Sequence, residues 1–336
     1  APAGRQRIHL IPHNRADQVE LSPKVRHELF TARQREFSMP LNQTDIALTA
    51  EDLAIYRQKG YWISPVLFDG DEVQVMRREL ERICAGERDY DGFFWLKQPN
   101  FGLDDPAVRQ VNNGWWINKV MRIAVKSPIL GYIGSQLMDT NEVRIWHDQM
   151  LWKPGLGPTG EPTLSNNIGW HQDYAHWQCA NTMNFCTAWV ALQDTDESNG
   201  CMRLVAGSHR WGLRRDANTF GEKNLEVLEA KYRPEDKKWK AKPCVLKAGQ
   251  ASFHHALTYH GSGPNLSTQP RLPIVVHMMP QDCGFTQRGR YHPNADLLGP
   301  YVEEADLFEG PSLSPYLANG QLGSLVHNKK SHSGLE

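Results

Sequence analysis

The stretch Gly169-Trp170-His171-Gln172-Asp173-Tyr174 places a histidine and an aspartate two residues apart, and His260-Gly261-Ser262-Gly263 supplies a second histidine later in the chain. In an extended strand, side chains alternate between the two faces with a period of two. We therefore expect His171 and Asp173 on one face and Gln172 on the other. Two histidines and one carboxylate make the 2-His-1-carboxylate facial triad, which leaves coordination positions open and is typical of non-haem Fe(II) oxygenases. The pattern predicts a metal centre of His171, Asp173 and His260.

Short segments rich in β-branched and aromatic residues surround these two stretches. Turns rich in glycine, proline and asparagine separate them, such as Ser198-Asn199-Gly200 and Gly263-Pro264-Asn265. Such spacing is typical of a double-sheet jelly roll, the architecture that includes the cupins. We therefore expect a mainly β protein with flanking helices and a double-stranded β-helix core. The expected strands are residues 143–152, 185–193, 202–205, 250–257 and 274–279.

Helices are expected ahead of this β-rich part. Thr49-Ala50-Glu51-Asp52 has the spacing of a capping box, and Gly60 is a natural stop for the helix that follows it. A strand over 61–67 comes next. A second helix is expected over 69–85, where apolar residues recur along one face. A third begins at Ser127-Pro128 and runs to about Met138.

The remaining segments suggest one catalytic domain with additions at both ends. Residues 1–45 are polar and are expected to form an N-terminal arm, and residues 285–336 a wrapping C-terminal tail. The oxygenase domain is expected over 46–284. Within it, the aromatic-rich and irregular residues 89–118 form either a lid over a cavity or a surface loop tucked into the core.

The composition argues against several kinds of partner. Lys and Arg number 37 against 38 Asp and Glu, so no net field favours nucleic acid or an anionic membrane. No stretch approaches the ~18 apolar residues that cross a bilayer, and the N-terminus has no apolar signal-peptide core. The 6 cysteines occur without a CxxC pair, which suits reduced thiols. We expect a cytoplasmic protein, monomeric or homodimeric, that acts on a small molecule.

Several motifs occur in one order along the chain: Gly60-Tyr61-Trp62, Gly169 to Asp173, Trp189 to Leu192, Asn199 to Met202 leading to Gly207-Ser208-His209, and His260 through Arg271. This ordered set resembles the phytanoyl-CoA dioxygenase family of Fe(II)/2-oxoglutarate-dependent oxygenases, over roughly residues 46 to 282. The resemblance implies that His171, Asp173 and His260 hold Fe(II). It also implies 2-oxoglutarate at two of the open positions and O2 at the third.

The resemblance implies further residues for the co-substrate. Arg271 corresponds to the family's clamp arginine, and a planar guanidinium suits bidentate contact with the far carboxylate of 2-oxoglutarate. Ser262 lies two residues after His260, so it would share a strand face with that histidine and could add a hydroxyl. Gln149 matches a family glutamine near the co-substrate, and Trp189 matches a position that walls the same pocket.

Aromatic and histidine side chains are candidates for contact with the substrate. Tyr174, His176 and Trp177 follow the metal motif directly, although they could equally be ordinary lining of the barrel mouth. Trp152 and Trp116 are further candidates. The many aromatic residues favour a largely apolar substrate, such as a secondary metabolite or a lipid-like molecule.

Alternatives remain at the level of the sequence. His147-Asp148 and His254-His255 are rival ligands, but adjacent strand residues face opposite sides and cannot easily share one metal. Some relatives replace the carboxylate with a small residue that opens a halide site, so the presence of Asp173 favours hydroxylation, with release of succinate and CO2, over halogenation. Desaturation, ring closure or epimerisation stay open. So do a cupin-type metalloenzyme that does not use 2-oxoglutarate and a jelly-roll binding module.

Overall fold

The structure is a computed structural model that describes residues 46–89, 107–157, 160–218 and 221–284. The predicted N-terminal arm, the predicted C-terminal tail and residues 90–106 of the predicted lid lie outside these ranges. The division into arm, domain and tail therefore stays a prediction.

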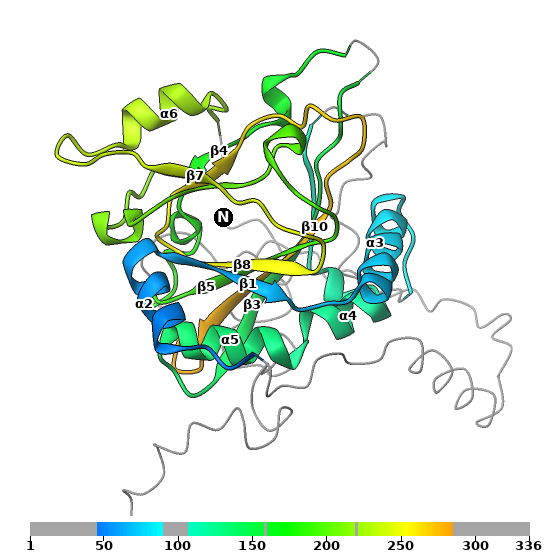
Figure 1. The fold of residues 1–336 in the computed structure, drawn as a ribbon, viewed down its shortest axis with the longest axis horizontal. Helices are drawn as coiled ribbons and strands as arrows, with labels where there is room; N and C mark the ends of the chain where they lie inside the picture. The colour runs from blue at the N-terminus through cyan, green and yellow to red at the C-terminus, as the bar shows by residue number, and fades with distance from the viewer. Residues whose placement is uncertain (1–45, 90–106, 158–159, 219–220, 285–336) are drawn as a thin grey trace, which may run out of the picture. The chain divides into compact units, whose positions relative to one another are not determined.

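Two antiparallel sheets face each other (Figure 1) and enclose an apolar core. The larger sheet has the order β1 (Tyr61–Val66), β8 (Gln250–His255), β5 (Cys186–Ala191), β10 (Pro273–Pro280), β3 (Val143–Trp152), β2 (Arg109–Asn112). The smaller sheet has the order β4 (Ile168–His171), β9 (His260–Ser262), β6 (Arg203–Val205), β7 (Ala241–Pro243). The predicted double-stranded β-helix is confirmed, and each predicted strand is present with ends that differ by a few residues at most. The short strands β2 and β7 were not predicted, since neither carries an apolar run.

The central strands of the larger sheet are covered on both faces. Every residue of β10 is buried, and so is every residue of β5. This explains why Ile274-Val275-Val276 reads as a continuous apolar run rather than an alternation, because neither face meets water. Two polar residues interrupt these strands, Thr187 in β5 and His277 in β10, and both belong to the site described below.

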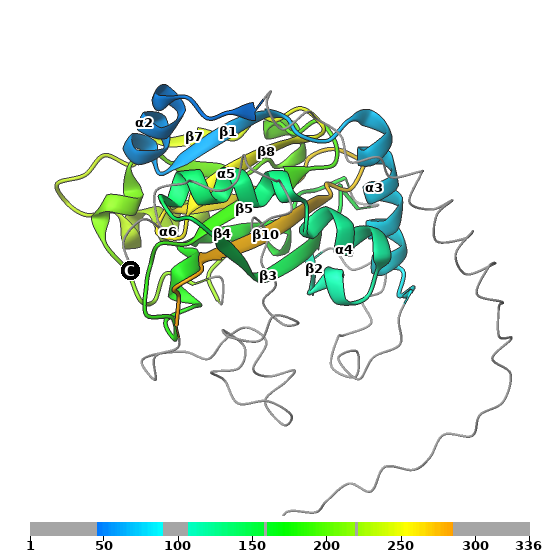
Figure 2. The same ribbon diagram turned by 90° about the horizontal axis from the view of Figure 1, so that it is seen from below.

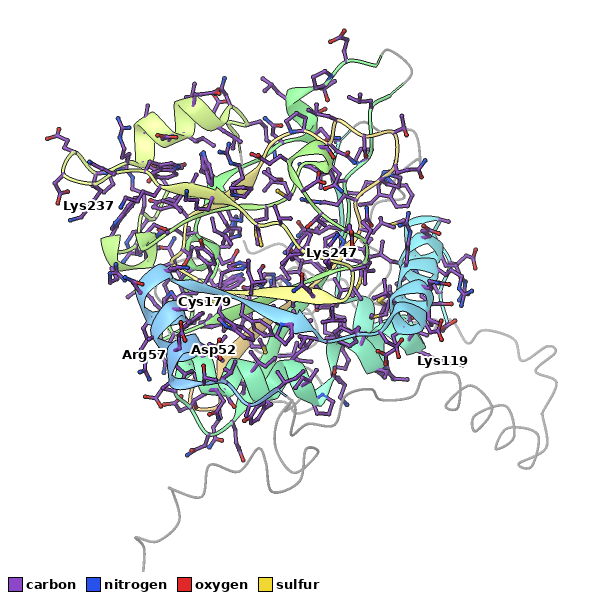
Figure 3. All side chains as sticks on the ribbon, in the orientation of Figure 1. Asp52, Arg57, Lys119, Cys179, Lys237 and Lys247 are labelled. Carbon is purple, nitrogen blue, oxygen red and sulfur yellow. The ribbon has the colours of Figure 1, made fainter. Side chains whose placement is uncertain are left out.

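The first helix, α2 (Ala50–Lys59), begins and ends where the sequence indicates. The Thr49 hydroxyl accepts a hydrogen bond from the main-chain N–H of Asp52, and the Asp52 carboxylate accepts one from the main-chain N–H of Thr49. These two bonds complete the capping box. Gly60 ends the helix with a positive φ of 79°, a conformation that glycine adopts without strain. Trp62 Nε1 donates to Asp52 Oδ1 at 2.8 Å and so ties β1 to this helix. Figure 3 labels Asp52 and Arg57 on α2.

Four more helices follow in the described part of the chain, and three of them flank the larger sheet. The predicted helix over 69–85 is α3 (Gly70–Cys84), which is capped by Asp69 and buries Val73, Met76, Leu80 and Ile83. Helix α5 (Pro128–Met138) crosses the outer face of the sheet (Figure 2). Ser127 precedes it, but its side chain makes no capping hydrogen bond. Neither α4 (Lys119–Val125) nor α6 (Leu225–Tyr232), which lies beside β4, was predicted.

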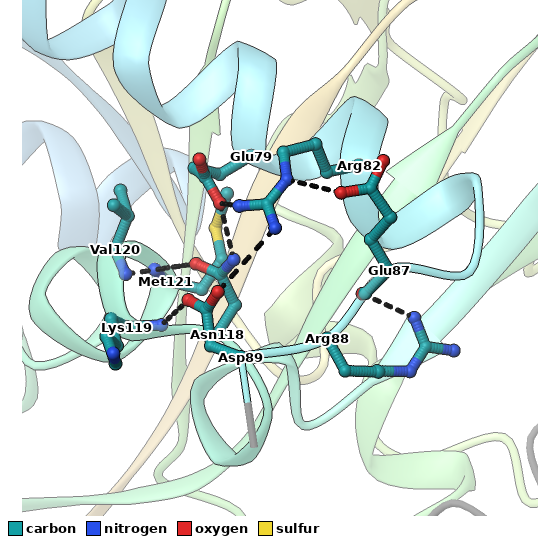
Figure 4. A network of polar contacts seen from close by, with 9 residues as sticks. All are labelled: Glu79, Arg82, Glu87, Arg88, Asp89, Asn118, Lys119, Val120 and Met121. Atoms are coloured by element: carbon teal, nitrogen blue, oxygen red, sulfur yellow. Dashed lines mark hydrogen bonds and ion pairs between the residues drawn. The ribbon is translucent and has the colours of Figure 1, made fainter. Parts of the chain in front are cut away.

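A polar network joins the end of α3 to the start of α4, as Figure 4 shows. Arg82 forms ion pairs with Glu79 at 2.6 Å and with Glu87 at 2.7 Å. Asn118 Nδ2 donates to Glu79 Oε2 at 2.6 Å, and the main-chain N–H of Lys119 donates to Asp89 Oδ2 at 2.9 Å. The network therefore holds together the two positions that bound the predicted lid.

The cysteines and helices agree with two of the predictions from composition. All six cysteines are buried free thiols. Among the described residues, the helices are too short or too polar to cross a membrane. The cytoplasmic location and the oligomeric state stay predictions.

Candidate metal centre

The two histidines of the predicted triad lie on neighbouring strands of the smaller sheet. His171 ends β4 and is the cross-strand partner of His260, which begins β9. Directly opposed residues of an antiparallel pair project from the same face. The two imidazole rings accordingly lie with their centroids 4.0 Å apart. They face the larger sheet, because the His260 ring also lies 4.4 Å from that of His254 in β8.

The third ligand, Asp173, is not on the strand. β4 ends at His171, and Asp173 begins a 3-10 turn over Asp173–Ala175, so the expectation of one strand carrying both side chains is wrong. The carboxylate nevertheless meets the two rings. Its Oδ1 lies 3.6 Å from Nε2 of His171 and 3.4 Å from Nε2 of His260. A turn, rather than strand alternation, brings it there.

Gln172 points away from the metal centre, as the sequence predicts, and anchors the turn. Its Nε2 donates to the carbonyls of Gly212 and Leu257, each at 2.9 Å, and its Oε1 accepts from the main-chain N–H of Arg214 at 2.7 Å. This side chain is fully bonded and buried. It therefore fixes the main chain between the first two ligands.

The main chain sets the orientation of both imidazoles. Nδ1 of His171 lies 2.8 Å from the Gly169 carbonyl, and Nδ1 of His260 lies 2.9 Å from the Thr258 carbonyl. A carbonyl can only accept, so each ring carries its proton on Nδ1 and leaves Nε2 as the ligand atom. The three ligand atoms all lie within 4.8 Å of one another. In the described ranges no other group of His, Cys, Asp and Glu side chains has this arrangement.

The second oxygen of Asp173 is held by the larger sheet. Thr187 Oγ1 donates to Oδ2 at 2.8 Å and is also 2.8 Å from His277 Nδ1. His254 Nε2 lies 3.3 Å from the same oxygen. One carboxylate oxygen is therefore committed to the protein, which leaves Oδ1 for a metal. Sequence reasoning missed Thr187 and His277, although a polar residue inside a wholly apolar strand was a signal that could have found them.

The charge states of the triad suit a divalent cation. Burial lowers the pKa of His260 to about 4 and holds the pKa of His171 well below its ordinary value. Burial alone would raise the pKa of Asp173, but the imidazoles of His260 and His254 beside it hold that pKa well below the usual range. At neutral pH the site thus offers neutral imidazoles and an ionised carboxylate, the forms that bind a metal. Two nitrogens and one oxygen with open positions fit Fe(II).

Three of the four rival ligands lie elsewhere, and the fourth, His254, lies beside the triad but faces Oδ2 of Asp173 rather than Oδ1. His147 packs against the ring of His277, with centroids 4.4 Å apart. Asp148 accepts from the main-chain N–H groups of Gly114 and Trp115 on the other face of β3. His255 lies beside His209, with ring centroids 5.6 Å apart. None of the three therefore contributes to the triad.

A second group of residues, which we call the clamp, consists of Arg271, Lys153, Ser262 and Trp189. Arg271 and Lys153 form an antiparallel bridge through main-chain hydrogen bonds of 2.8 and 3.0 Å. The Arg271 guanidinium lies 5.1 Å from the centroid of the Trp189 ring and donates to the Gly200 carbonyl. Lys153 Nζ donates to Ser262 Oγ at 2.9 Å. Sequence reasoning missed Lys153, since lysine is rarely buried.

Gln149 lies between the metal centre and the clamp. Val275 of β10 is the cross-strand partner of both Gln149 and Trp189, so the three residues form one row across the sheet. The adjacent row on the same face contains His277 and Thr187, next to Asp173. Gln149 and Trp189 are thus arranged along one face of the larger sheet, whereas Ser262 lies on β9 of the smaller sheet.

The clamp fits the far end of a dicarboxylate. Ser262 is two residues along β9 from His260, which corresponds to about 6.6 Å of extended strand, comparable to the length of 2-oxoglutarate. Arg271 is buried, its Nε has no hydrogen-bond partner, and burial lowers its pKa to about 10. A buried guanidinium that keeps one N–H without a partner is suited to bind a carboxylate. The structure therefore supports a metal at one end and a carboxylate at the other.

The residues that follow the metal motif have different surroundings. The Tyr174 hydroxyl donates to the Ala180 carbonyl at 2.7 Å, and its ring is buried. Trp177 is buried, and its ring centroid lies 4.7 Å from that of His277, whose Nδ1 is 3.9 Å from Asp173 Oδ2. The His176 ring centroid is 6.2 Å from that of His171. Of the three, His176 is the half-buried one beside a metal ligand.

The other two predicted substrate residues lie near the far face of β3. The Arg109 guanidinium is 5.4 Å from the centroid of the Trp152 ring, and strand alternation places Trp152 opposite to Lys153. Trp116 is buried in the 3-10 turn Gly114–Trp116, which Asp148 anchors. A contact of these residues with substrate stays a prediction.

Comparison with known proteins agrees with this site. Residues 56–272 match the family model described as phytanoyl-CoA dioxygenase (PhyH). Peroxisomal phytanoyl-CoA dioxygenase of Mus musculus is 23% identical over 259 residues, which cover 76% of this chain and 74% of that protein. The carbocyclase SnoK from nogalamycin biosynthesis matches with a TM-score of 0.62 and 24% identity, over 84% of this chain and 100% of SnoK. The epimerase SnoN, in complex with Fe3+, alpha ketoglutarate and nogalamycin RO, matches with a TM-score of 0.56 and 25% identity, over 74% and 88%.

The matched region contains the whole triad and Arg271 and spans well over half of the chain. The predicted family is therefore confirmed, together with its iron and 2-oxoglutarate cofactors. This chain belongs to the phytanoyl-CoA dioxygenase (PhyH) family of Fe(II)/2-oxoglutarate-dependent oxygenases.

Proposed function

We propose that this chain hydroxylates an unactivated C–H bond of a largely apolar small molecule while 2-oxoglutarate is converted to succinate and CO2. The observation that carries the proposal is the intact third ligand. Asp173 directs Oδ1 toward both histidines, at 3.6 and 3.4 Å from their Nε2 atoms. A carboxylate in this place leaves no room for a halide on iron, which favours oxygen transfer over halogenation.

The chain's own residues hold and orient the reacting groups. His171, Asp173 and His260 would hold Fe(II), and Thr187 keeps the Asp173 carboxylate turned so that one oxygen faces the metal. Arg271 would bind the far carboxylate of 2-oxoglutarate. When bound, the iron and the co-substrate supply the activation of O2.

An apolar wall between the sheets separates the clamp from water. Trp189, Leu151, Leu204 and Val275 belong to one buried cluster that draws on both sheets. A water-poor pocket strengthens the attraction between a cation and a carboxylate. It also keeps water from competing for the open coordination positions. The wall thus supports a reaction confined to the bound substrate.

The substrate class is proposed from the aromatic content and from one relative. The SnoN complex contains nogalamycin RO, which supports a ring-containing small molecule as substrate here. The same relative is an epimerase and SnoK is a carbocyclase, so epimerisation or ring closure at a C–H carbon is a second candidate. Product mass separates the candidates, because hydroxylation adds one oxygen, ring closure removes two hydrogens, and epimerisation leaves the mass unchanged.

The test has two stages. Wild-type protein is first mixed with Fe(II) and 2-oxoglutarate without oxygen, and a weak visible charge-transfer band is expected. A small-molecule library is then screened with oxygen for accelerated succinate release, and products of the hits are weighed by mass spectrometry. An absent band in wild-type protein would overturn the proposal, and hits whose products lack added oxygen would favour the second candidate.

A further inference from the structure

A row of polar side chains crosses the larger sheet next to the metal centre. His254 in β8 is the cross-strand partner of Thr187 in β5, and Thr187 is also the partner of His277 in β10. His277 in turn opposes His147 in β3. Directly opposed residues project from the same face of a sheet. Because the Thr187 hydroxyl contacts Asp173, this face is the one toward the metal ligands.

Packing of the core does not account for this row. The three histidines and Thr187 are all buried, in strands that are covered on both faces. Apolar side chains fill such strands without needing hydrogen-bond partners, whereas a buried polar atom without a partner is costly. Among the described residues, Nε2 of His277 and Nδ1 of His254 have no hydrogen-bond partner. The row therefore opposes folding unless the carboxylate beside it benefits.

The Thr187 hydroxyl fixes the direction of two hydrogen bonds. Its Oγ1 is 2.8 Å from Asp173 Oδ2 and 2.8 Å from His277 Nδ1. An ionised carboxylate can only accept, so the single hydroxyl hydrogen goes to Oδ2. Nδ1 of His277 must then carry a hydrogen and donate to Oγ1, which strengthens the bond that the hydroxyl donates. With the opposite tautomer, His277 would compete with Asp173 for the hydroxyl hydrogen.

His254 approaches the same carboxylate oxygen. Its Nε2 is 3.3 Å from Asp173 Oδ2, and its ring centroid is 4.4 Å from that of His260. A hydrogen on Nε2 makes this contact attractive, whereas a lone pair there would repel the carboxylate. His254 and Thr187 thus both face Oδ2, and Oδ1 is left toward the two ligand histidines.

We propose that His254 and His277 are positioning residues that, with Thr187 between them, hold Oδ2 of Asp173 so that the carboxylate binds the metal through Oδ1 alone. A carboxylate can bind a cation through one oxygen or through both. Binding through both would occupy a coordination position that the facial triad otherwise leaves open. This role rests on the triad as the iron site of the proposed function, and it is the same whichever substrate is oxidised.

The test replaces both histidines together, with two different kinds of side chain. The leucine pair, His254→Leu with His277→Leu, removes both donors and keeps apolar bulk. The amide pair, His254→Gln with His277→Asn, keeps a donor, because the amide nitrogens of Gln and Asn lie close to the places of Nε2 and Nδ1 respectively. His147→Leu is the matched control. It removes a buried imidazole of the same row whose Nδ1 lies 3.4 Å from the Asp148 carbonyl.

Two measurements without oxygen are made on each full-length protein. Calorimetry gives Kd for Fe(II). Nitric oxide, which binds ferrous iron at the position left for O2, is then titrated at saturating Fe(II) and 2-oxoglutarate and followed by EPR. We expect the leucine pair to raise Kd for Fe(II) about 10- to 100-fold, the range for losing partners of a metal ligand. It should also lose most of the nitric oxide signal at a concentration that saturates wild type.

The amide pair and His147→Leu should stay close to wild type in both measurements. A role in packing alone predicts the opposite order, because leucine suits a buried apolar strand better than an amide does. Wild-type Fe(II) affinity or wild-type nitric oxide binding in the leucine pair would overturn the proposal, and so would a larger loss in the amide pair. If wild-type protein binds no Fe(II), the triad fails as the iron site and the proposal fails with it.

A second measurement applies if the leucine pair does not fold. Wild-type protein is loaded with Zn(II) and labelled with 15N-histidine, and the ring-nitrogen spectrum identifies the tautomer of each histidine. The signals of His277 and His254 are recognised by their absence in His277→Asn and in His254→Gln. We expect His277 to carry its hydrogen on Nδ1 and His254 on Nε2. The opposite tautomer at either position would contradict the proposal.

Discussion

The metal centre and the clamp lie along the same inner surface of the two sheets, but they are built from opposite charges. At the metal centre one carboxylate, Asp173, is surrounded by imidazoles and by the Thr187 hydroxyl. At the clamp two basic side chains, Arg271 and Lys153, lie together without an acidic partner among the described residues, and burial together with the Arg271 charge holds the pKa of Lys153 well below its ordinary value. The metal centre thus has its ligands in place, whereas the clamp has basic groups without a counterion.

This difference shows how one pocket can bind two kinds of ligand. The metal centre satisfies the outer atoms of each ligand by hydrogen bonds, so that binding a cation requires little rearrangement. The clamp keeps donors that only an anion can satisfy. A dicarboxylate would bridge the two, with one end on the metal and the other on the cations. Substitutions at one end therefore test whether binding at the other end changes.

The largest effect is expected from Asp173→Ala, which removes the only anionic ligand. Losing a hydrogen-bond partner of a metal ligand typically lowers metal affinity about 10- to 100-fold. Losing the ligand itself should lower Fe(II) affinity further, so the variant should retain almost no iron. The iron content of the protein after gel filtration measures how much iron the variant retains. Asp194→Ala is the control, because that carboxylate is 60% exposed and pairs with Lys247. Stoichiometric iron in Asp173→Ala would show that the triad is not the metal site.

The next effect is expected from Arg271→Ala, which acts on the clamp alone. Kd for 2-oxoglutarate should rise about 100-fold or more, as for breaking a buried ion pair, while the iron content stays at the wild-type level. Arg271→Lys should not restore binding, because lysine lacks the planar fork. The charge-transfer band at low 2-oxoglutarate reports the loss. A band equal to wild type would refute the clamp.

An effect on folding stability, rather than on binding, is expected from acid on the metal-free protein. Burial lowers the pKa of His260 and of His147 to about 4, from an ordinary value of 6.5. The unfolded chain therefore takes up protons first, so the stability is fully present above pH 6.5 and is lost as the pH falls toward 4. Each histidine contributes on the order of 3 kcal/mol across this window. Urea unfolding at pH 7.5, 6 and 5 measures the slope, and equal free energies of unfolding would contradict it.

The smallest effect is expected from Thr187→Val, which keeps the shape of the side chain and removes its hydroxyl. Asp173 Oδ2 loses its 2.8 Å hydrogen bond, so Fe(II) affinity should fall about 10-fold. Thr187→Ser should retain the affinity, because it keeps the donor. Binding of 2-oxobutyrate to the iron-loaded variant at saturating Fe(II) should be unchanged. Wild-type Fe(II) affinity in Thr187→Val would show that this bond does not position the carboxylate.

Local features of the fold were predictable where neighbours in sequence make the contacts. The capping box of Thr49 and Asp52 and the stop at Gly60 depend on residues within one turn. The strand β10 was predictable from its apolar run, and β3 because it is rich in β-branched and aromatic residues. Short elements such as β7 and α6 were missed, since they carry weak patterns and are stabilised by packing against β6 and β4.

By itself, the sequence determined the reaction class, because the order of His171, Asp173, His260 and Arg271 resembles the family's pattern and predicts the ligands and the clamp. Only the tertiary structure decided how they meet. Asp173 reaches the metal centre from a 3-10 turn, and Thr187, His277 and Lys153 join the site because β5, β10 and the end of β3 pair across large distances in sequence. The cost of a buried charge depends on which partners surround it, and those partners come together only when the two sheets close.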